Sequence, residues 1–231
     1  MDLTAVNGGA LLTGLDAVTL AAGDDVVFLA SQVTGLTIGV TGTNAATDLF
    51  TVNGATGTVN DTINLSGVSL TTAGVSVAAG AGADTITANA GGGAFNFGTG
   101  ADTFTAGAGT DAITIGDTDS GITVATADSI TGFLSGTDTL TLGLIGDNTA
   151  NTGNYVEAGA AVADFAAALA AANTGLAVLN STSAAATLYN FQFDATNGYL
   201  FEDTDSDGDA DQVIILVGET NATIAHSDII A

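Results

Sequence analysis

The sequence predicts a mainly β fold: a parallel β-roll or β-solenoid, followed by a C-terminal β-rich region that carries one short helix. Three observations lead to this fold class. Gly occurs 32 times among 231 residues, together with abundant Thr, Val and Ile, which is typical of short strands joined by tight turns. Along most of the chain an aspartate is followed by a short apolar segment, a pattern called the aspartate step below. Between residues 79 and 114 this pattern repeats every nine residues.

The aspartate step predicts where strands begin, because a turn, an aspartate and then a strand form the recurring unit. Its spacing is irregular before about residue 78 and regular afterwards. Residues 1–78 are therefore predicted to form a β-sheet or an irregular β-solenoid region, and the spacing leaves its register open. The aspartates of this step are Asp25, Asp48, Asp61, Asp84, Asp102, Asp111, Asp128 and Asp138.

The regular part divides into four frames of nine residues. Three of the frames carry Gly at the second and fourth positions and Asp at the sixth, and all four carry Ile or Phe at the eighth. The frames are Ala79–Thr87, Ala88–Asn96, Phe97–Thr105 and Ala106–Thr114, with glycines Gly80, Gly82, Gly98, Gly100, Gly107 and Gly109 and aspartates Asp84, Asp102 and Asp111.

This pattern resembles the nonapeptide of the RTX (repeats-in-toxin) family, G-G-x-G-x-D-x-U-x, where U is a large apolar residue. Two features depart from it: Ala or Phe replaces the first Gly, and Gly93 stands where the second frame should carry Asp. The resemblance implies a calcium-binding β-roll over residues 79–145. The alternative is a Gly-rich structural solenoid without metal.

The charge balance independently favours a cation. The chain has 22 Asp and 3 Glu but no Lys or Arg, which gives a formal net charge of −25. A carboxylate here is balanced only by metal, backbone N–H, water, the N-terminal amine or His226, and burying it unpaired is costly. Carboxylate and backbone oxygens are hard ligands, which favour Ca²⁺. The alternative is a merely soluble acidic surface.

The spacing of the aspartates predicts a first calcium site. In a β-roll, two nine-residue turns make one full coil, so Asp84 and Asp102 should face each other across one Ca²⁺. Backbone carbonyls of the glycine turns would complete the oxygen shell, because Gly accepts positive φ and close approach. Asp111 lies eighteen residues after Gly93 and so lacks a carboxylate partner on that side; eighteen residues further stands Ser129, beside Asp128.

The region after the repeats, residues 146–231, is predicted to contain a helix and β-hairpins. Before it, residues 128–142 resemble the closing strands that follow RTX repeats in secreted bacterial proteins. Over residues 161–172, Val162, Phe165 and Leu169 share one helical face, which predicts a helix docked on a sheet and stopped by residues 173–175. Strands are predicted over 186–194, 199–202 and 212–217, with a turn at 197–198.

The loop between the last two of these strands is the densest acidic cluster and predicts a second calcium site. It matches the first half of an EF-hand loop, D-x-D-x-D-G, although position twelve is Ile214 instead of Glu and the flanks are strands. The alternative is a solvated acidic turn. The candidate ligands are Asp203, Asp205, Asp207, Asp209 and Asp211.

Composition also excludes several function classes. The absence of Lys and Arg excludes nucleic acid and anionic membranes as partners. The absence of Cys excludes disulfides and thiolate chemistry, and no apolar stretch is long enough for a transmembrane helix. With one histidine and no distinguished acid–base pair among 25 acids, an enzyme is not expected.

A secreted, calcium-binding structural protein is therefore expected at the cell surface, as an S-layer or extracellular filament subunit. The end of the chain, residues 225–231, resembles the uncleaved signal of type I secreted proteins. Expected partners are further copies of the chain, the type I secretion machinery and a cell-surface polysaccharide. One alternative is the calcium-folded export module of a larger toxin or hydrolase. Another is an adhesin or ice-binding module, which flat threonine ladders facing solvent would favour.

Overall fold

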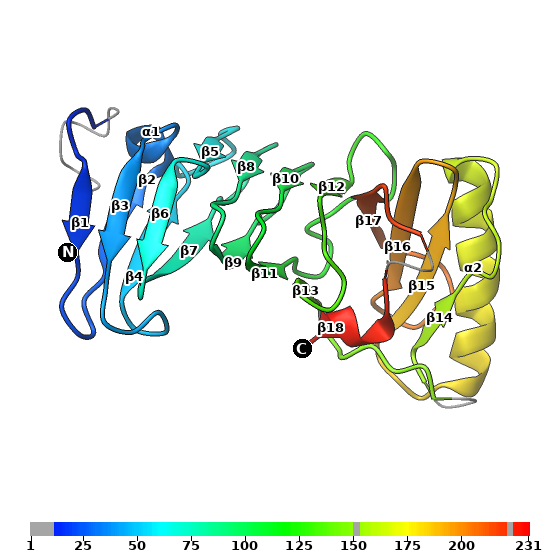
Figure 1. The fold of residues 1–231 in the computed structure, drawn as a ribbon. Coiled ribbons are helices and arrows are strands. Elements are labelled where there is room, and N and C mark those ends of the chain that lie inside the picture. Colours follow the sequence, from blue (N-terminus) through cyan, green and yellow to red (C-terminus); the bar gives the residue numbers. More distant parts are fainter. Residues whose placement is uncertain (1–11, 150–152, 221–223) are drawn as a thin grey trace. The chain divides into compact units, whose positions relative to one another are not determined.

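The computed structural model describes residues 12–149, 153–220 and 224–231, and it confirms a mainly β fold with parallel sheets. The chain divides into two compact units after Thr114. The strands of each unit are described separately below (Figure 1).

The first unit is built from parallel strands in three sheets. Every strand pairing within it is parallel, and from β7 onward consecutive strands alternate between the second and the third of these sheets. The sheets are β1 (Ala17–Thr19), β3 (Ile38–Thr41) and β6 (Val68–Thr71); β5 (Thr62–Asn64), β8 (Thr85–Thr87) and β10 (Thr103–Thr105); and β2 (Val26–Leu29), β4 (Leu49–Asn53), β7 (Gly74–Ala78), β9 (Gly92–Asn96) and β11 (Thr110–Thr114). A four-residue helix, α1 (Ala30–Val33), follows β2.

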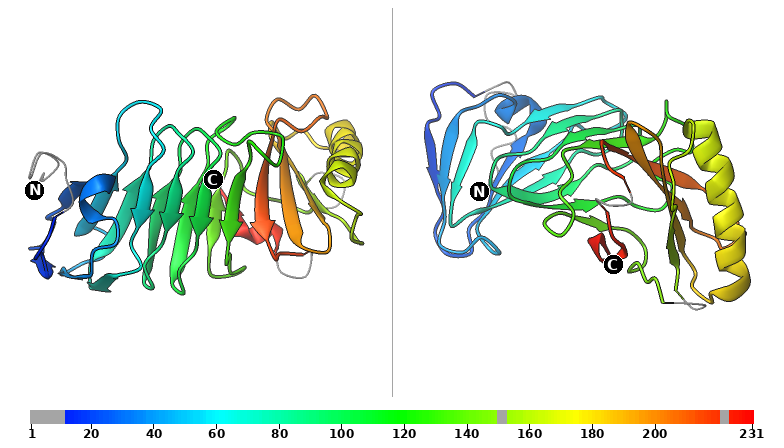
Figure 2. Two further views of the ribbon diagram at one scale, coloured as in Figure 1. Left: turned by 90° about the horizontal axis from the view of Figure 1, so that it is seen from above. Right: turned by 45° about the vertical axis from the view of Figure 1, so that its right-hand side comes forward.

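The register of these strands follows the predicted period in the regular part of the sequence. Ile86 in β8 pairs with Phe104 in β10, eighteen residues later, and Ala94 in β9 pairs with Ala112 in β11 at the same separation. The steps are longer before the repeats begin, since Ile63 pairs with Ile86 across twenty-three residues. Parallel pairing thus continues through the irregular part of the sequence (Figure 2).

Large apolar side chains form the core of this unit. The strand residues that point inward are almost completely buried, as period-two alternation requires. Phe104 of β10 lies 4.9 Å from Phe95 of β9 and 5.2 Å from Phe97, measured between ring centroids. These rings connect two sheets, and such aromatic contacts are typical of well-packed cores.

The predicted link between aspartates and strand starts is confirmed. Six of the eight aspartates immediately precede a strand, Asp128 is the first residue of its strand and Asp111 is the second residue of β11. The six buried members of the set are Asp48, Asp84, Asp102, Asp111, Asp128 and Asp138. A buried carboxylate at a strand start requires hydrogen-bond donors or a cation. These six positions are therefore where a bound cation or backbone N–H donors should be sought.

The second unit contains a mixed sheet and a small parallel pair. The sheet order is β14, β15, β16, β17, β12, with antiparallel pairing around β16 and parallel pairing at both outer positions. Its strands are β14 (Tyr155–Glu157), β15 (Leu188–Phe193), β16 (Asn197–Asp203), β17 (Gln212–Val217) and β12 (Asp128–Thr131). A further parallel pairing of this unit joins β13 (Thr139–Thr141) and β18 (Ile229–Ile230).

The predicted turn at Asn197-Gly198 is wrong, because both residues belong to β16. The chain reverses just before them, where the Asp194 carboxylate accepts hydrogen bonds from the backbone N–H groups of Thr196 and Asn197. An aspartate whose side chain bonds two residues ahead closes the turn without the glycine that the sequence pattern suggested. A Cβ on Gly198 would lie 2.5 Å from the Phe191 ring, so Gly is required for packing there.

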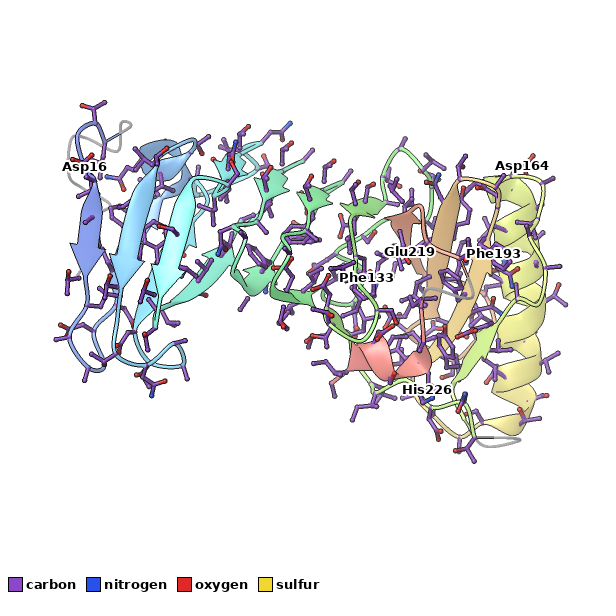
Figure 3. All side chains as sticks on the ribbon, viewed as in Figure 1. Asp16, Phe133, Asp164, Phe193, Glu219 and His226 are labelled. Atoms are coloured by element: carbon purple, nitrogen blue, oxygen red, sulfur yellow. The ribbon has the colours of Figure 1, made fainter. Side chains whose placement is uncertain are left out.

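The predicted helix is present but longer than expected: α2 runs from Phe165 to Thr182. Asp164 caps its first turn by accepting a hydrogen bond from the Ala167 N–H, and Figure 3 shows it at that end of the helix. The predicted stop fails because Gly175 lies inside the helix, where a Cβ would come within 2.0 Å of Asn190 on β15. Close packing on the sheet, and not helix termination, accounts for this glycine.

Helix α2 covers one face of the mixed sheet (Figures 1 and 2). Ala168, Ala172 and Leu176 are buried against residues of β15, β16 and β17, with Phe165 and Leu169 packed beside them. The predicted docking of the helix on a sheet is thus confirmed. No helix in the described parts of the chain combines the length and apolarity needed to cross a membrane.

The C-terminal tail is part of the fold of the second unit. Ile229 is fully buried and pairs with Leu140 of β13. Asp228 accepts hydrogen bonds from the Ser135 hydroxyl at 2.6 Å and from the Gly136 N–H at 2.9 Å. The segment predicted as a secretion signal is therefore packed into the fold of this unit.

Candidate metal centre

The hairpin loop between β16 and β17 brings three carboxylates together. Ligand-capable oxygen atoms of Asp203, Asp205 and Asp211 all lie within 4.8 Å of one another. Asp203 ends β16 and is completely buried, and burial raises the pKa of its carboxyl group. Three carboxylates at this separation repel one another, and a cation bound among them would offset that repulsion.

Backbone groups hold the loop in a shape that gathers these side chains. The two carboxylate oxygens of Asp203 accept hydrogen bonds from the Ser206 N–H at 2.6 Å and the Gly208 N–H at 2.9 Å. Asp211 closes the other side by accepting from the Thr204 N–H and hydroxyl, both at 2.8 Å. Gly208 adopts φ +96°, a backbone conformation that glycine reaches without strain.

Neighbouring segments fix the loop in place. Asn173 of α2 accepts a hydrogen bond from the Ala210 N–H at 3.1 Å. The Ser206 hydroxyl donates to the carbonyls of Ala185 and Ala186, which precede β15. These contacts with other segments order the loop in the absence of an ion. The entropy cost of ordering the loop would therefore not reduce the affinity for an ion.

The three gathered aspartates occupy positions one, three and nine of the EF-hand-like pattern that the sequence predicts. The calcium ligands of such loops include these positions. Asp207 and Asp209 are exposed and lie outside the three-carboxylate group, so only three of the five predicted ligands converge. Ile214 at position twelve is buried in β17, and the bidentate ligand of an EF-hand therefore has no counterpart there.

The second candidate site lies in the first unit, where aspartates stand in line along the strands β5, β8 and β10. Asp84 accepts a hydrogen bond through Oδ1 from the Asp61 N–H at 2.7 Å. Asp102 does the same with the Asp84 N–H at 2.6 Å. The structure thus places Asp84 and Asp102 immediately before two adjacent strands, as their spacing predicts, but it also shows that a backbone amide satisfies one oxygen of each.

The remaining oxygen of Asp84 leaves the site chemically incomplete. Asp84 is 1% exposed, and its Oδ2 has no hydrogen-bond partner. Burial raises the pKa of this carboxyl group, the Asp61 N–H opposes the rise, and the nearby Asp61 carboxylate adds to it. A buried carboxylate oxygen without a donor fits a bound cation and also fits a protonated carboxyl group.

Asp111 lies apart from this line. It is buried in β11 and pairs with Gly93 of β9, eighteen residues earlier in the chain. Its Oδ2 accepts a hydrogen bond from the Gly107 N–H at 2.8 Å. Asp128, the other residue considered for this site, begins β12 of the second unit and pairs there with Ile214.

The repeat glycines are required mainly because successive turns approach closely. Gly98 has φ +80°, and a Cβ on it would lie 1.7 Å from the Gly80 carbonyl oxygen. A Cβ on Gly100 would likewise lie 1.7 Å from the Gly82 carbonyl oxygen. Positive φ is found, as predicted, at Gly80, Gly82, Gly98 and Gly100. Gly107 and Gly109 do not adopt positive φ, which corrects the prediction for the fourth frame; a Cβ on either would overlap backbone atoms of residues 89–92.

Replacing Gly98 by Ala should therefore be strongly destabilising. We expect a loss of roughly 2 kcal/mol or more beyond that of Gly23→Ala, since overpacking adds about 1–3 kcal/mol to the cost of positive φ. Gly23 is a matched control because its φ is +79° and nothing lies within 4 Å of the position that a Cβ would take there. Urea unfolding of both variants measures the difference, and equal midpoints would show that the turns do not stack closely.

Two carboxyl groups were missed as site candidates at the level of sequence. Asp61 belongs to the line of Asp84 and Asp102. It begins the same Asp-Thr-Ile sequence as Asp84, which could have identified it, but the two aspartates are twenty-three residues apart instead of eighteen. Glu202 on β16 is fully buried beside Gln212, and burial raises its pKa to about 7. No sequence pattern marks Glu202, because its environment is formed by Tyr189 and Gln212 on the two strands that pair with β16.

Comparison with known proteins does not assign the chain to a family. No protein-family model matches the chain, and the search of curated proteins gives no match. The resemblance to the RTX family consequently depends on the nonapeptide motif and the eighteen-residue register alone.

Proposed function

We propose that this protein is a secreted structural protein that binds calcium, and that calcium promotes its folding and assembly at the cell surface. The observation that carries the proposal is the convergence of Asp203, Asp205 and Asp211 in a chain without Lys or Arg. Such a cluster has no protein cation to balance it, and oxygen ligands in a preformed loop favour Ca²⁺ over softer metals.

The residues present fit a calcium ion at the hairpin loop. Asp203, Asp205 and Asp211 would hold the ion, with water or backbone oxygens supplying the other ligands, and the ion would neutralise their charge. The second proposed site lies between Asp84 and Asp102, where the unpartnered oxygen of Asp84 supports it. Strands that alternate between sheets with an eighteen-residue register support the finer assignment of residues 79–114 as a β-roll.

Calcium binding would link folding to the compartment. Where calcium is scarce, repulsion among 25 acidic groups favours an open chain that is suited to export. Outside the cell, the free energy of binding adds to the free energy of folding. An S-layer or filament subunit made in this way needs no disulfide and no enzymatic activity.

Calcium removal provides the test of this function. Circular dichroism should show a less ordered chain and a lower melting temperature in chelator than in millimolar calcium, because binding to the folded state stabilises it. Magnesium at the same concentration should restore little of the difference, since Mg²⁺ demands a stricter octahedral geometry. Identical melting curves in calcium and in chelator would contradict the proposal.

A further inference from the structure

The outward face of β5, β8 and β10 carries an ordered array of threonine. On these three strands one residue points inward and its two neighbours point outward. Parallel pairing aligns the outward residues into two rows, Thr62, Thr85 and Thr103 in one and Asn64, Thr87 and Thr105 in the other. Five of the six positions are thus threonine, and the three residues of the first row are exposed.

Strand propensity alone does not account for this array. The neighbouring sheet in the same unit has comparable strands, and its outward residues are also in register. There the rows are mixed: Thr51, Ser76, Ala94 and Ala112 in one and Asn53, Ala78, Asn96 and Thr114 in the other. Compared with that sheet, threonine is concentrated on the face of β5, β8 and β10, although β-branched residues would favour both sheets equally. The remaining sheet of this unit carries one exposed row of threonine, Thr19, Thr41 and Thr71, and its other row is Ala17, Gly39 and Ser69.

The array has a regular spacing and no exposed charge of its own. Adjacent strands lie about 4.8 Å apart and alternate residues of a strand about 6.6 Å apart, which gives a nearly rectangular grid of hydroxyl and methyl groups. Distances between water molecules on faces of the ice lattice are close to both repeats. Asp84 and Asp102, which precede the grid on two of its strands, turn inward and are 1% exposed. In a chain of net charge −25 this neutral face is a distinct surface.

We propose that this face, defined by Thr62, Thr85, Thr103, Asn64, Thr87 and Thr105, binds ice. Methyl groups order the adjacent water, and hydroxyl groups hold that water by hydrogen bonds, so a grid with the spacing of ice presents a preformed layer of ordered water. This inference is independent of the calcium sites.

A polysaccharide or a second copy of the chain fits this surface less well. Flat polysaccharides are bound largely by stacking on exposed aromatic rings, whereas the large hydrophobic residues exposed in the described parts of the chain are all aliphatic. A second copy would bring two chains of the same high negative charge together without an apolar patch on this face to offset their repulsion.

The test is incorporation of the folded, calcium-loaded chain into slowly growing ice, together with thermal hysteresis. The wild-type protein should be enriched in ice over the liquid and should lower the freezing point below the melting point. Thr85→Tyr, at the centre of the grid, should lose most of both effects because its ring stands above the plane. Tyr is well tolerated in strands, and circular dichroism checks the fold.

Ala78→Tyr is the matched control, since Ala78 is exposed on β7 in the neighbouring sheet. It should retain the wild-type enrichment and hysteresis. Exclusion of the folded wild-type chain from ice would overturn the inference, and so would equal behaviour of the two tyrosine variants. Calcium-dependent folding is recorded in the same samples, so a failure to bind ice would leave the proposed calcium function standing.

Discussion

Replacing Asp203 by Asn should weaken calcium binding at the hairpin loop at least about 10–100-fold, because even the loss of a supporting group around a metal ligand has an effect of that size. Asp203 is the buried member of the three-carboxylate group, and Asn removes its charge while keeping one oxygen for the Ser206 or Gly208 N–H. Isothermal titration calorimetry with calcium measures the change.

Asp209→Asn is the control for this prediction. Asp209 lies in the same loop and was itself a candidate ligand, but it is exposed and outside the converging group. Its substitution removes the same formal charge from the same loop, so a general electrostatic effect would appear in both variants. We expect a small loss of affinity for Asp209→Asn, and equal losses in the two variants would show that the loop is only a solvated acidic turn.

Replacing Asp84 by Asn should lower the stability of the chain in calcium but not in chelator. In chelator the substitution removes a buried carboxylate whose Oδ2 has no partner and keeps an oxygen for the Asp61 N–H, so stability should be unchanged or higher. In calcium it should remove the stabilisation due to the site, about 2.7 kcal/mol when free calcium is 100 times the dissociation constant. Urea unfolding with and without calcium measures both changes.

This experiment distinguishes two roles for the carboxylates of Asp61, Asp84 and Asp102: accepting backbone hydrogen bonds alone, or also binding calcium. If the carboxylates serve only to accept backbone N–H groups, the effect of Asp84→Asn will not depend on calcium. Asp25→Asn is a suitable comparison, since Asp25 also precedes a strand and accepts a backbone hydrogen bond, from the Leu49 N–H, yet is exposed. A calcium-dependent loss in Asp84→Asn alone supports the metal site.

Local sequence patterns were sufficient to predict much of the fold of the first unit. The aspartate step located the strand starts because a carboxylate at the end of a turn bonds to backbone N–H groups wherever strands stack in parallel. The nine-residue frames predicted the eighteen-residue register because identical turns repeat the same geometry. Spacing of this kind is local information, and it carries over directly to the structure.

The sequence-based predictions were wrong where a residue type is required by packing against another secondary-structure element. Gly175 resembles a helix stop in the sequence, but the helix continues because Asn190 requires the space that a side chain would fill. Gly198 resembles a turn residue, but its absent side chain makes room for Phe191. Of the acidic loop, the pattern identified all three converging aspartates but could not separate them from Asp207 and Asp209, because alternation along the loop does not determine which carboxylates turn inward.

Calcium-dependent assembly tests the central claim most directly, and light scattering of the purified chain measures it. Copies with a net charge of −25 repel one another, and salt screens this repulsion only beyond a Debye length of about 8 Å at physiological ionic strength. Millimolar calcium should therefore produce ordered polymers that chelator dissolves, whereas sodium or magnesium at matched ionic strength should not. Assembly driven by sodium alone, or a calcium-loaded chain that stays monomeric at high concentration, would contradict the account.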